Sequence, residues 1–228
     1  MKVLSVIRAE SIRAVRRVSG DYGYWPTAVA AVVQEYGFLT QPTVEELSAA
    51  MTDPGKGLTF RGGTLETGGK RVAIDYLQIF SAGLSVATHS HSSESDFALE
   101  HIMNWSKSQF HFEFEELKQG IGHSSQLEVR LEASLAKLFP LLSTVGDMIK
   151  QGLDDWWGFK PPYELINLNF WFDKTEFPAF APPIFRLDRR DNIPFEQEVY
   201  YSEAPMSTDS HVAVLDKLER VCLEGLNK

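Results

Sequence analysis

The sequence contains one cysteine, fewer basic than acidic residues and no hydrophobic run of membrane-spanning length. The lone Cys222 excludes an intrachain disulfide and a metal site built on several cysteines. The 31 acidic residues outnumber the 22 basic ones and give a formal net charge of -9, which disfavours general binding to nucleic acid or to an anionic membrane. Because the sequence shows neither a signal peptide nor a spanning segment, we expect a cytoplasmic protein with no membrane partner.

Motifs of known chemistry are also missing. The sequence has no serine in a nucleophile elbow, no zinc-binding His-Glu helix and no pair of carboxylates in a catalytic frame. The glycines at Gly63 and Gly68 do not make a phosphate-binding loop, because they lead into an extended segment instead of a helix. We therefore expect a noncatalytic protein without a cofactor.

What the sequence does contain is enough apolar material for a large core, with 43% hydrophobic and 12% aromatic residues in 228. Residues 72–80 are apolar on both faces of an extended segment, which is typical of a central strand. Gly83 permits a tight reversal, and residues 84–88 then alternate as a half-buried strand does. Ser93 and Asp96 stand at capping-box spacing, so a helix should follow this hairpin.

The same succession of strand, turn, strand and hydroxyl-capped helix recurs in residues 184–220, which favours an internal hairpin-helix duplication. The pattern predicts an α+β protein with a mixed or antiparallel sheet of at least six strands and helices packed mainly on one face. We expect a single domain over residues 1–228. The alternative is a subdivision into 1–158 and 159–228, at the Pro161-Pro162 pair.

Other segments give less regular patterns. Residues 3–7 and 12–18 are predicted as two short extended pieces, and residues 110–115 and 127–131 as two strands separated by glycines. A helix over residues 135–153 carries apolar residues at helical spacing and is expected to bury them. These apolar residues are Leu138, Leu142, Val145 and Ile149.

The first twenty residues are locally basic, with only Glu10 as an acid. Their basic residues are Lys2, Arg8, Arg13, Arg16 and Arg17. Because the whole chain is acidic, we interpret this segment as a basic strand face or interface segment and consider a nucleic-acid partner unlikely.

Aromatic and proline residues crowd the stretch from residue 156 to residue 183. In an extended segment 166–172, Trp171 lies on the face of Asn167 and Asn169, opposite Phe170. Large aromatics at a polar-rimmed surface favour protein association, although a second layer of the same chain could equally cover them. The aromatic residues of this predicted interface are Trp156, Trp157, Phe159, Trp171 and Phe177.

A charged cluster follows, in which Arg186, Arg189 and Arg190 alternate with Asp188 and Asp191. Guanidinium groups bind carboxylates and phosphates bidentately, so the arginines could extend the predicted interface. The alternative is a strand end whose acids and bases pair with one another.

Five of the six histidines fall between residues 89 and 123, among several acids. A metal site of His89, His91, His111 and Glu113 is sterically conceivable, but the spacing matches no established zinc pattern. From these sequence features we consider two functions. The first is a noncatalytic interaction or assembly protein that binds a protein partner or itself, as a homo-oligomer. The alternative is a metal-assisted hydrolase or phosphate-processing enzyme that uses residues 89–115.

Overall fold

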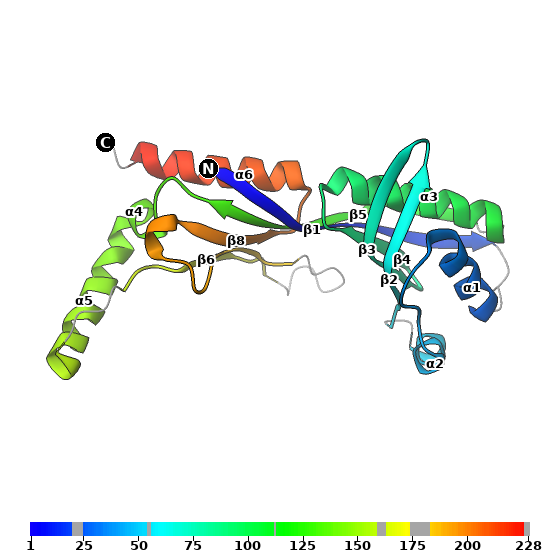
Figure 1. Cartoon of the computed structure of the whole chain (residues 1–228), viewed down its shortest axis with the longest axis horizontal. Helices are drawn as coiled ribbons and strands as arrows, with labels where there is room; N and C mark the ends of the chain where they lie inside the picture. The colour runs from blue at the N-terminus through cyan, green and yellow to red at the C-terminus, as the bar shows by residue number, and fades with distance from the viewer. Residues whose placement is uncertain (20–24, 54–55, 112, 159–162, 174–182, 226–228) are drawn as a thin grey trace. The chain divides into compact units, whose positions relative to one another are not determined.

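The computed structural model describes residues 1–19, 25–53, 56–111, 113–158, 163–173 and 183–225. These residues form six α-helices and eight strands, and the hydrogen-bonded strand order is β2-β3-β4-β1-β5-β8-β7-β6 (Figure 1). Every strand pair whose register is resolved, β1 with β4 among them, is antiparallel. The predicted α+β class and the predicted sheet of at least six strands are confirmed.

The chain topology repeats. Each half contains one long strand, two helices, three strands and a final helix. The first half consists of β1 (Lys2–Ser19), α1 (Trp25–Tyr36), α2 (Val44–Thr52), β2 (Leu58–Thr67), β3 (Lys70–Phe80), β4 (Gly83–Thr88) and α3 (Ser92–Phe110). The second consists of β5 (Glu113–Arg130), α4 (Leu135–Leu138), α5 (Pro140–Trp157), β6 (Asn167–Phe170), β7 (Phe185–Arg189), the 3₁₀ helix η1 (Phe195–Gln197), β8 (Val199–Ala204) and α6 (Thr208–Gly225). Read outward from the middle of the sheet, the order is β1-β4-β3-β2 in one half and β5-β8-β7-β6 in the other, which confirms the duplication.

By their internal contacts the residues divide into two compact units, which we describe separately. Unit 1 comprises Met1–Ser5, Gln126–Pro205 and Asp209–Lys228, and unit 2 comprises Val6–Ser125 and Met206–Thr208. Each unit therefore combines residues from both halves of the sequence, because β1 and β5 each contribute to both units.

In unit 2 the predicted hairpin and helix are confirmed as β3, β4 and α3, but the burial of the two strands differs from the prediction: β4 is buried throughout, whereas β3 is only partly buried. Leu77 pairs with Val86 and Ile79 with Leu84, and α3 packs over this hairpin. The start of α3 differs from the expected capping box, because the side chain of His91 accepts the N–H of Ser93. A capping box is present at the start of α2, where the side chains of Thr43 and Glu46 each accept the backbone N–H of the other residue.

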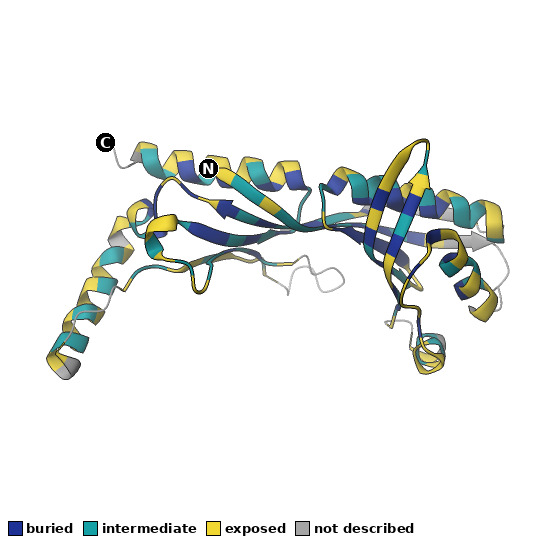
Figure 2. Cartoon of the chain, viewed as in Figure 1, coloured by how far each residue is buried: buried dark blue, intermediate teal, exposed yellow. Residues whose placement is uncertain are grey.

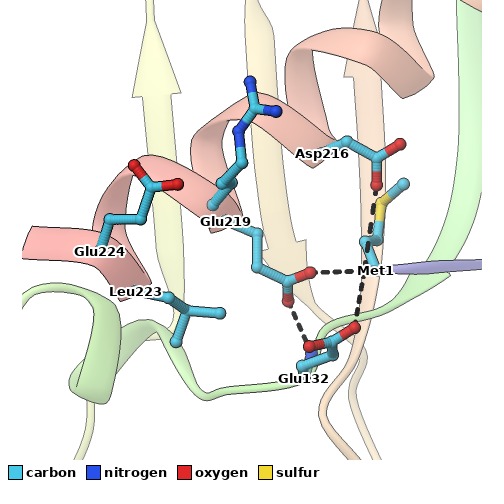
Figure 3. A pocket seen from close by; sticks show the side chains of 7 residues that line it. Met1, Glu132, Asp216, Glu219, Leu223 and Glu224 are labelled. Atoms are coloured by element: carbon cyan, nitrogen blue, oxygen red, sulfur yellow. Dashed lines mark hydrogen bonds and ion pairs between the residues drawn. The ribbon is translucent and has the colours of Figure 1, made fainter. Parts of the chain in front are cut away.

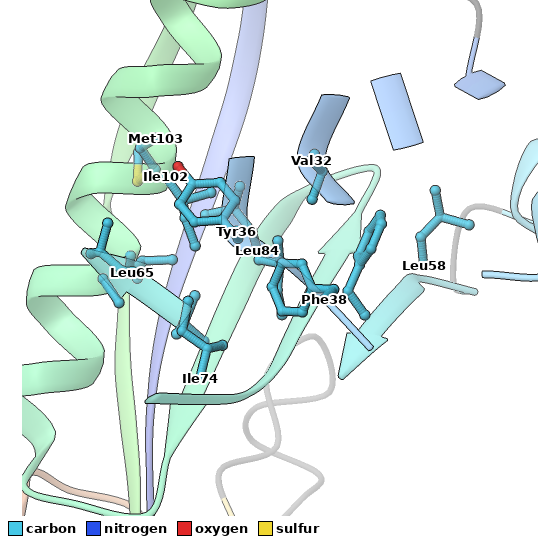
Figure 4. Close-up of a cluster of buried hydrophobic side chains, with 14 of the residues drawn as sticks. Val32, Tyr36, Phe38, Leu58, Leu65, Ile74, Leu84, Ile102 and Met103 are labelled. Carbon is cyan, nitrogen blue, oxygen red and sulfur yellow. The ribbon is translucent and has the colours of Figure 1, made fainter. Parts of the chain in front are cut away.

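The core of unit 2 lies between its strands and the helices α1 and α3. Figure 4 shows Val32 and Tyr36 of α1, Ile102 and Met103 of α3 and Ile74 of β3 in this cluster. Tyr36 packs edge-on against Trp105 with ring centroids 5.4 Å apart. The apolar side of α1 is thus covered within the chain.

Two long strands replace the pairs of shorter pieces expected from the sequence. β1 is continuous from Lys2 to Ser19, and β5 continues through both of its glycines. Gly120 explains this continuity, since an ideal Cβ there would lie 2.7 Å from the carbonyl oxygen of Ala14 on β1. Gly120, which we expected to separate two strands, is instead a site of close contact between β1 and β5.

The expected strand at residues 110–115 is also displaced. Phe110 is the last residue of α3, and His111 ends the helix in the left-handed conformation with φ 54°. Residue 112 lies outside the described residues, and β5 begins at Glu113.

Unit 1 has its own core under α6. His211 and Leu215 of α6 are fully buried, and the ring of His211 packs against Phe185 of β7 with centroids 6.0 Å apart. Leu187 of β7 and Tyr200 of β8 are also fully buried. In Figure 2 this buried layer appears as dark blue on the strands of unit 1 and on one side of α6.

Candidate interaction surface

Unit 1 departs most from the sequence prediction at α5, whose apolar side is exposed. The predicted helix 135–153 is divided at Phe139 into α4 and α5, with Pro140 in the first turn of α5, where its missing N–H costs no helical hydrogen bond. Gly158 ends α5 in the left-handed conformation. Leu138, the last residue of α4, is buried as expected.

The residues of α5 that we expected to be buried are exposed. Leu142, Val145, Met148 and Ile149 retain between 38% and 70% of their accessible surface. At 100° per residue these positions fall within an arc of about 120°, so they form one continuous side of the helix, which we call the apolar face of α5. Figure 2 shows α5 in yellow and teal along its length, without the dark blue side that α3 and α6 have.

The opposite side of α5 is polar and internally paired. On this side Lys150 Nζ lies 3.2 Å from Asp147 Oδ1. At the edge of the apolar face, seven residues after Met148, Asp155 Oδ1 accepts a hydrogen bond from Gln151 Nε2 at 3.1 Å. At 100° per residue, Asp147 and Asp154 lie opposite Val145 and Ile149. The apolar face therefore carries no charge at its centre.

One contact fixes α5 to the segment that follows it. An ideal Cβ on Gly146 would lie 2.5 Å from the carbonyl oxygen of Tyr163, so only glycine allows this backbone approach. Tyr163 is itself 45% exposed.

Two of the five predicted interface aromatics have a described backbone position at the end of α5. Trp156 and Trp157 form its last turn, but their side chains lie outside the described part of the structure, as do Phe159 and Phe177 altogether. Trp171 follows β6 and is 60% exposed, next to exposed Asn169, as the alternation predicted. Phe170, expected on the covered face, is 56% exposed and contacts Phe185.

The three predicted arginines are each paired with an acid. Arg186 Nε lies 2.9 Å from Glu203 Oε2, and Arg190 Nε donates to Glu128 Oε1 at 2.9 Å. The side chain of Arg189 is only 5% exposed. It donates to Glu198 and Tyr200 and to the carbonyl of Phe195, so Arg189 stabilises the interior of unit 1.

Arg186 also belongs to a polar row across four strands. Its register partners are Asn169 on β6 and Glu203 on β8, and Gln126 of β5 donates to Glu203 at 3.1 Å. Hydrogen bonding to Tyr201 and the nearby acids raise the pKa of Arg186 above its usual value, so this guanidinium stays charged. The row extends the polar surface beside Trp171 but is satisfied within the chain.

The four residues of the alternative metal site are not brought together. His89 donates to the carbonyl of Ile7 at 2.7 Å and lies 3.5 Å from Asp75. His91 caps α3, His111 ends it, and Glu113 begins β5. Among the residues that the structure describes, no three histidine, cysteine or acidic side chains form a group that could hold a metal ion.

Asp96 has a role that the sequence did not reveal. It accepts from His123 Nε2 at 3.0 Å and from Arg13 at 3.2 Å, while Ser11 and Ser95 share a buried hydrogen bond beside it. Burial raises the pKa of Asp96, but hydrogen bonds from Ser11 and His123 and the charge of Arg13 outweigh it, so the pKa lies below 3.8. This network joins α3 to β1 and β5 within unit 2.

A cavity of about 290 Å³ lies at the start of β1 in unit 1 (Figure 3). The amine of Met1 lies 2.5 Å from Glu219 Oε2, which is almost fully buried, and 3.4 Å from Glu132 Oε1. The hydrogen bond to Glu219 raises the pKa of this amine above 8.0. Asp216 is 3.9 Å from the same amine. Three acids that line this cavity therefore surround the amine of Met1.

Comparison with known proteins gives no family. No family model matches the chain, and no curated protein sequence matches it. Three chains of known structure match, one of them titled "Methanococcus jannaschii TBP". That alignment covers 96% of this chain and 98% of the other, with a TM-score of 0.43 and 13% sequence identity, values at which it supports no argument about function. No helix in the described residues is long and apolar enough to cross a membrane.

Proposed function

We propose that this chain is a noncatalytic interaction protein that assembles with a second copy of itself, or with a larger complex, through the apolar face of α5. The observation that carries the proposal is the exposure of Leu142, Val145, Met148 and Ile149 on one side of a single helix. A contiguous apolar patch of this kind is typical of protein interaction sites, because water disfavours it and a partner can bury it.

The internal duplication provides a comparison within the molecule. In the first half, α1 follows the long strand and buries Val29, Val32 and Tyr36 in its own unit. In the second half, α4 and α5 occupy the corresponding place in the chain order, but α5 leaves its apolar face exposed. The difference supports a role for α5 outside the chain's own core.

Self-association is the form that we favour. The acids Asp147 and Asp154 lie on the far side of α5, so two copies can join their apolar faces without bringing these charges together. Trp171 and Arg186 on the polar side of unit 1 are of the residue types that dominate binding energy at interfaces. The proposal includes the cytoplasmic location that we expected from the sequence.

Sedimentation equilibrium of the full chain tests the proposal. Met148→Lys places a charge on the apolar face at a residue that is already 70% exposed, so folding should be unaffected while association weakens by about tenfold or more. Ser143→Lys adds the same charge on the side of α5 that carries Asp147 and Asp154, and this variant should associate as the wild type does. Equal association of both variants and the wild type would contradict the proposal.

A further inference from the structure

Two arginines of unit 2 share one tyrosine. The guanidinium carbon of Arg8 on β1 lies 5.8 Å from the ring centroid of Tyr76 on β3, and that of Arg61 on β2 lies 5.7 Å from it. Arg61 is the direct register partner of Tyr76, whereas Arg8 reaches the ring from a strand beyond β4. The ring is only 8% exposed between these neighbours, while Arg61 itself is exposed.

These two arginines differ in their charge partners from six other arginines of the chain. Six arginines pair with carboxylates: Arg13, Arg16, Arg71, Arg186, Arg189 and Arg190. Within the described part of the chain, neither Arg8 nor Arg61 forms an ion pair or donates a side-chain hydrogen bond. Burial and the nearby charge of Glu10 raise the pKa of Tyr76.

We propose that Arg8 and Arg61 form a binding site for a phosphate-bearing ligand on unit 2. A guanidinium held against an aromatic ring keeps its N–H groups in its own plane, where they can bind an oxyanion bidentately. Two such groups can share their donors among the three or more acceptor oxygens of a phosphate group, whereas a carboxylate presents only two oxygens. The locally basic first strand thus serves a specific anion, and this site is separate in residues and in role from the apolar face of α5.

Isothermal titration of the full chain with pyrophosphate, orthophosphate and acetate tests the site. We expect saturable binding of pyrophosphate, weaker binding of orthophosphate and no measurable binding of acetate. Arg8→Gln and Arg61→Gln should each weaken pyrophosphate binding by about tenfold or more, since each removes one charge-assisted bidentate contact.

Arg71→Gln is the matched control. Arg71 is an exposed arginine of the same unit, but it is paired with Glu66 at 3.1 Å. Its replacement removes the same charge and should leave the affinity unchanged within about twofold, because at physiological salt exposed charges a Debye length or more apart are largely screened. Arg61→Lys keeps the charge but loses the two parallel N–H donors of the guanidinium group. This variant should bind pyrophosphate more weakly than the wild type does, while unfolding at the same temperature.

Three results would overturn the proposal. They are the absence of pyrophosphate binding by the wild type, an equal loss in Arg71→Gln and Arg61→Gln, and acetate binding as tight as that of pyrophosphate. The first two would assign Arg8 and Arg61 to shielding the Tyr76 ring from water, and the third would assign the site to carboxylates.

Discussion

His211 is fully buried between α6 and the strands of unit 1, where its Nε2 and the hydroxyl of Ser202 lie 2.8 Å apart. Ser202 also donates to the carbonyl of Arg186, so a chain of hydrogen bonds connects α6 to β8 and β7. Burial lowers the pKa of His211 to about 4 from its ordinary value of 6.5. The folded protein therefore holds this imidazole neutral under conditions where the unfolded chain protonates it.

Protonation of His211 in the unfolded chain makes the free energy of unfolding depend on pH. Between pH 6.5 and about pH 4 the unfolded chain binds more protons at this residue, so the free energy of unfolding falls as the pH falls through this window. The loss amounts to about 3 kcal/mol across the window. His211→Gln, which keeps a polar side chain but cannot titrate, should flatten this part of the profile measured by urea unfolding. A slope identical to that of the wild type would exclude His211 as the cause.

Gly120 provides a second prediction for a single residue. Because a Cβ there would lie 2.7 Å from both the Cβ and the carbonyl oxygen of Ala14, Gly120→Ala should force β5 away from β1 and cost about 1–3 kcal/mol of stability. Gly152→Ala in α5 is the control, since nothing lies within 4 Å of its Cβ position and alanine favours the helix by about 0.5–1 kcal/mol. Chemical denaturation of both variants measures the two effects, and equal changes would contradict the strand contact.

Among the elements, α2 is a short helix that depends on its N-terminus. The Thr43 hydroxyl accepts the N–H of Glu46 at 3.2 Å, and Glu46 accepts the N–H of Thr43 at 2.8 Å. Thr43→Ala removes the acceptor of the Glu46 N–H and should destabilise α2 by about 1 kcal/mol. Faster amide hydrogen exchange confined to residues 44–52 would support this prediction, and unchanged exchange there would contradict it.

Elements specified by neighbouring residues could be predicted from the sequence. The hairpin of β3 and β4 follows from alternation around Gly83, and the capping box of α2 follows from the spacing of Thr43 and Glu46. Contacts distant in sequence could not be predicted in this way. We expected Gly120 to separate two strands, because the residue that requires a glycine there, Ala14, lies more than a hundred residues away in the sequence.

For the candidate surface too, features set by neighbouring residues could be predicted from the sequence, whereas contacts with distant residues could not. Periodicity correctly indicated that α5 is amphipathic, but it cannot say whether the apolar side meets the chain's own core or another molecule. The charged cluster at Arg186, Arg189 and Arg190 was located correctly in β7 and just after it, yet its pairing with Glu203, Glu198 and Glu128 depends on β8 and β5.

At the scale of the whole molecule, one topology occurs twice with different surfaces. The half that contains α1 and α2 encloses its apolar helix side in a core and places two unpaired guanidinium groups around Tyr76. The half that contains α4 and α5 exposes the apolar side and pairs Arg186 and Arg190 with acids. The two proposals thus assign a protein partner to one half and an anion to the other.

Hydrogen–deuterium exchange of the wild-type chain at low and at high protein concentration tests the central claim most directly. If α5 is the site of self-association, amides of residues 140–157 should exchange more slowly in the concentrated sample, and Met148→Lys should abolish this difference. Exchange in α5 that is independent of concentration, in a sample that nevertheless associates, would show that another surface forms the contact.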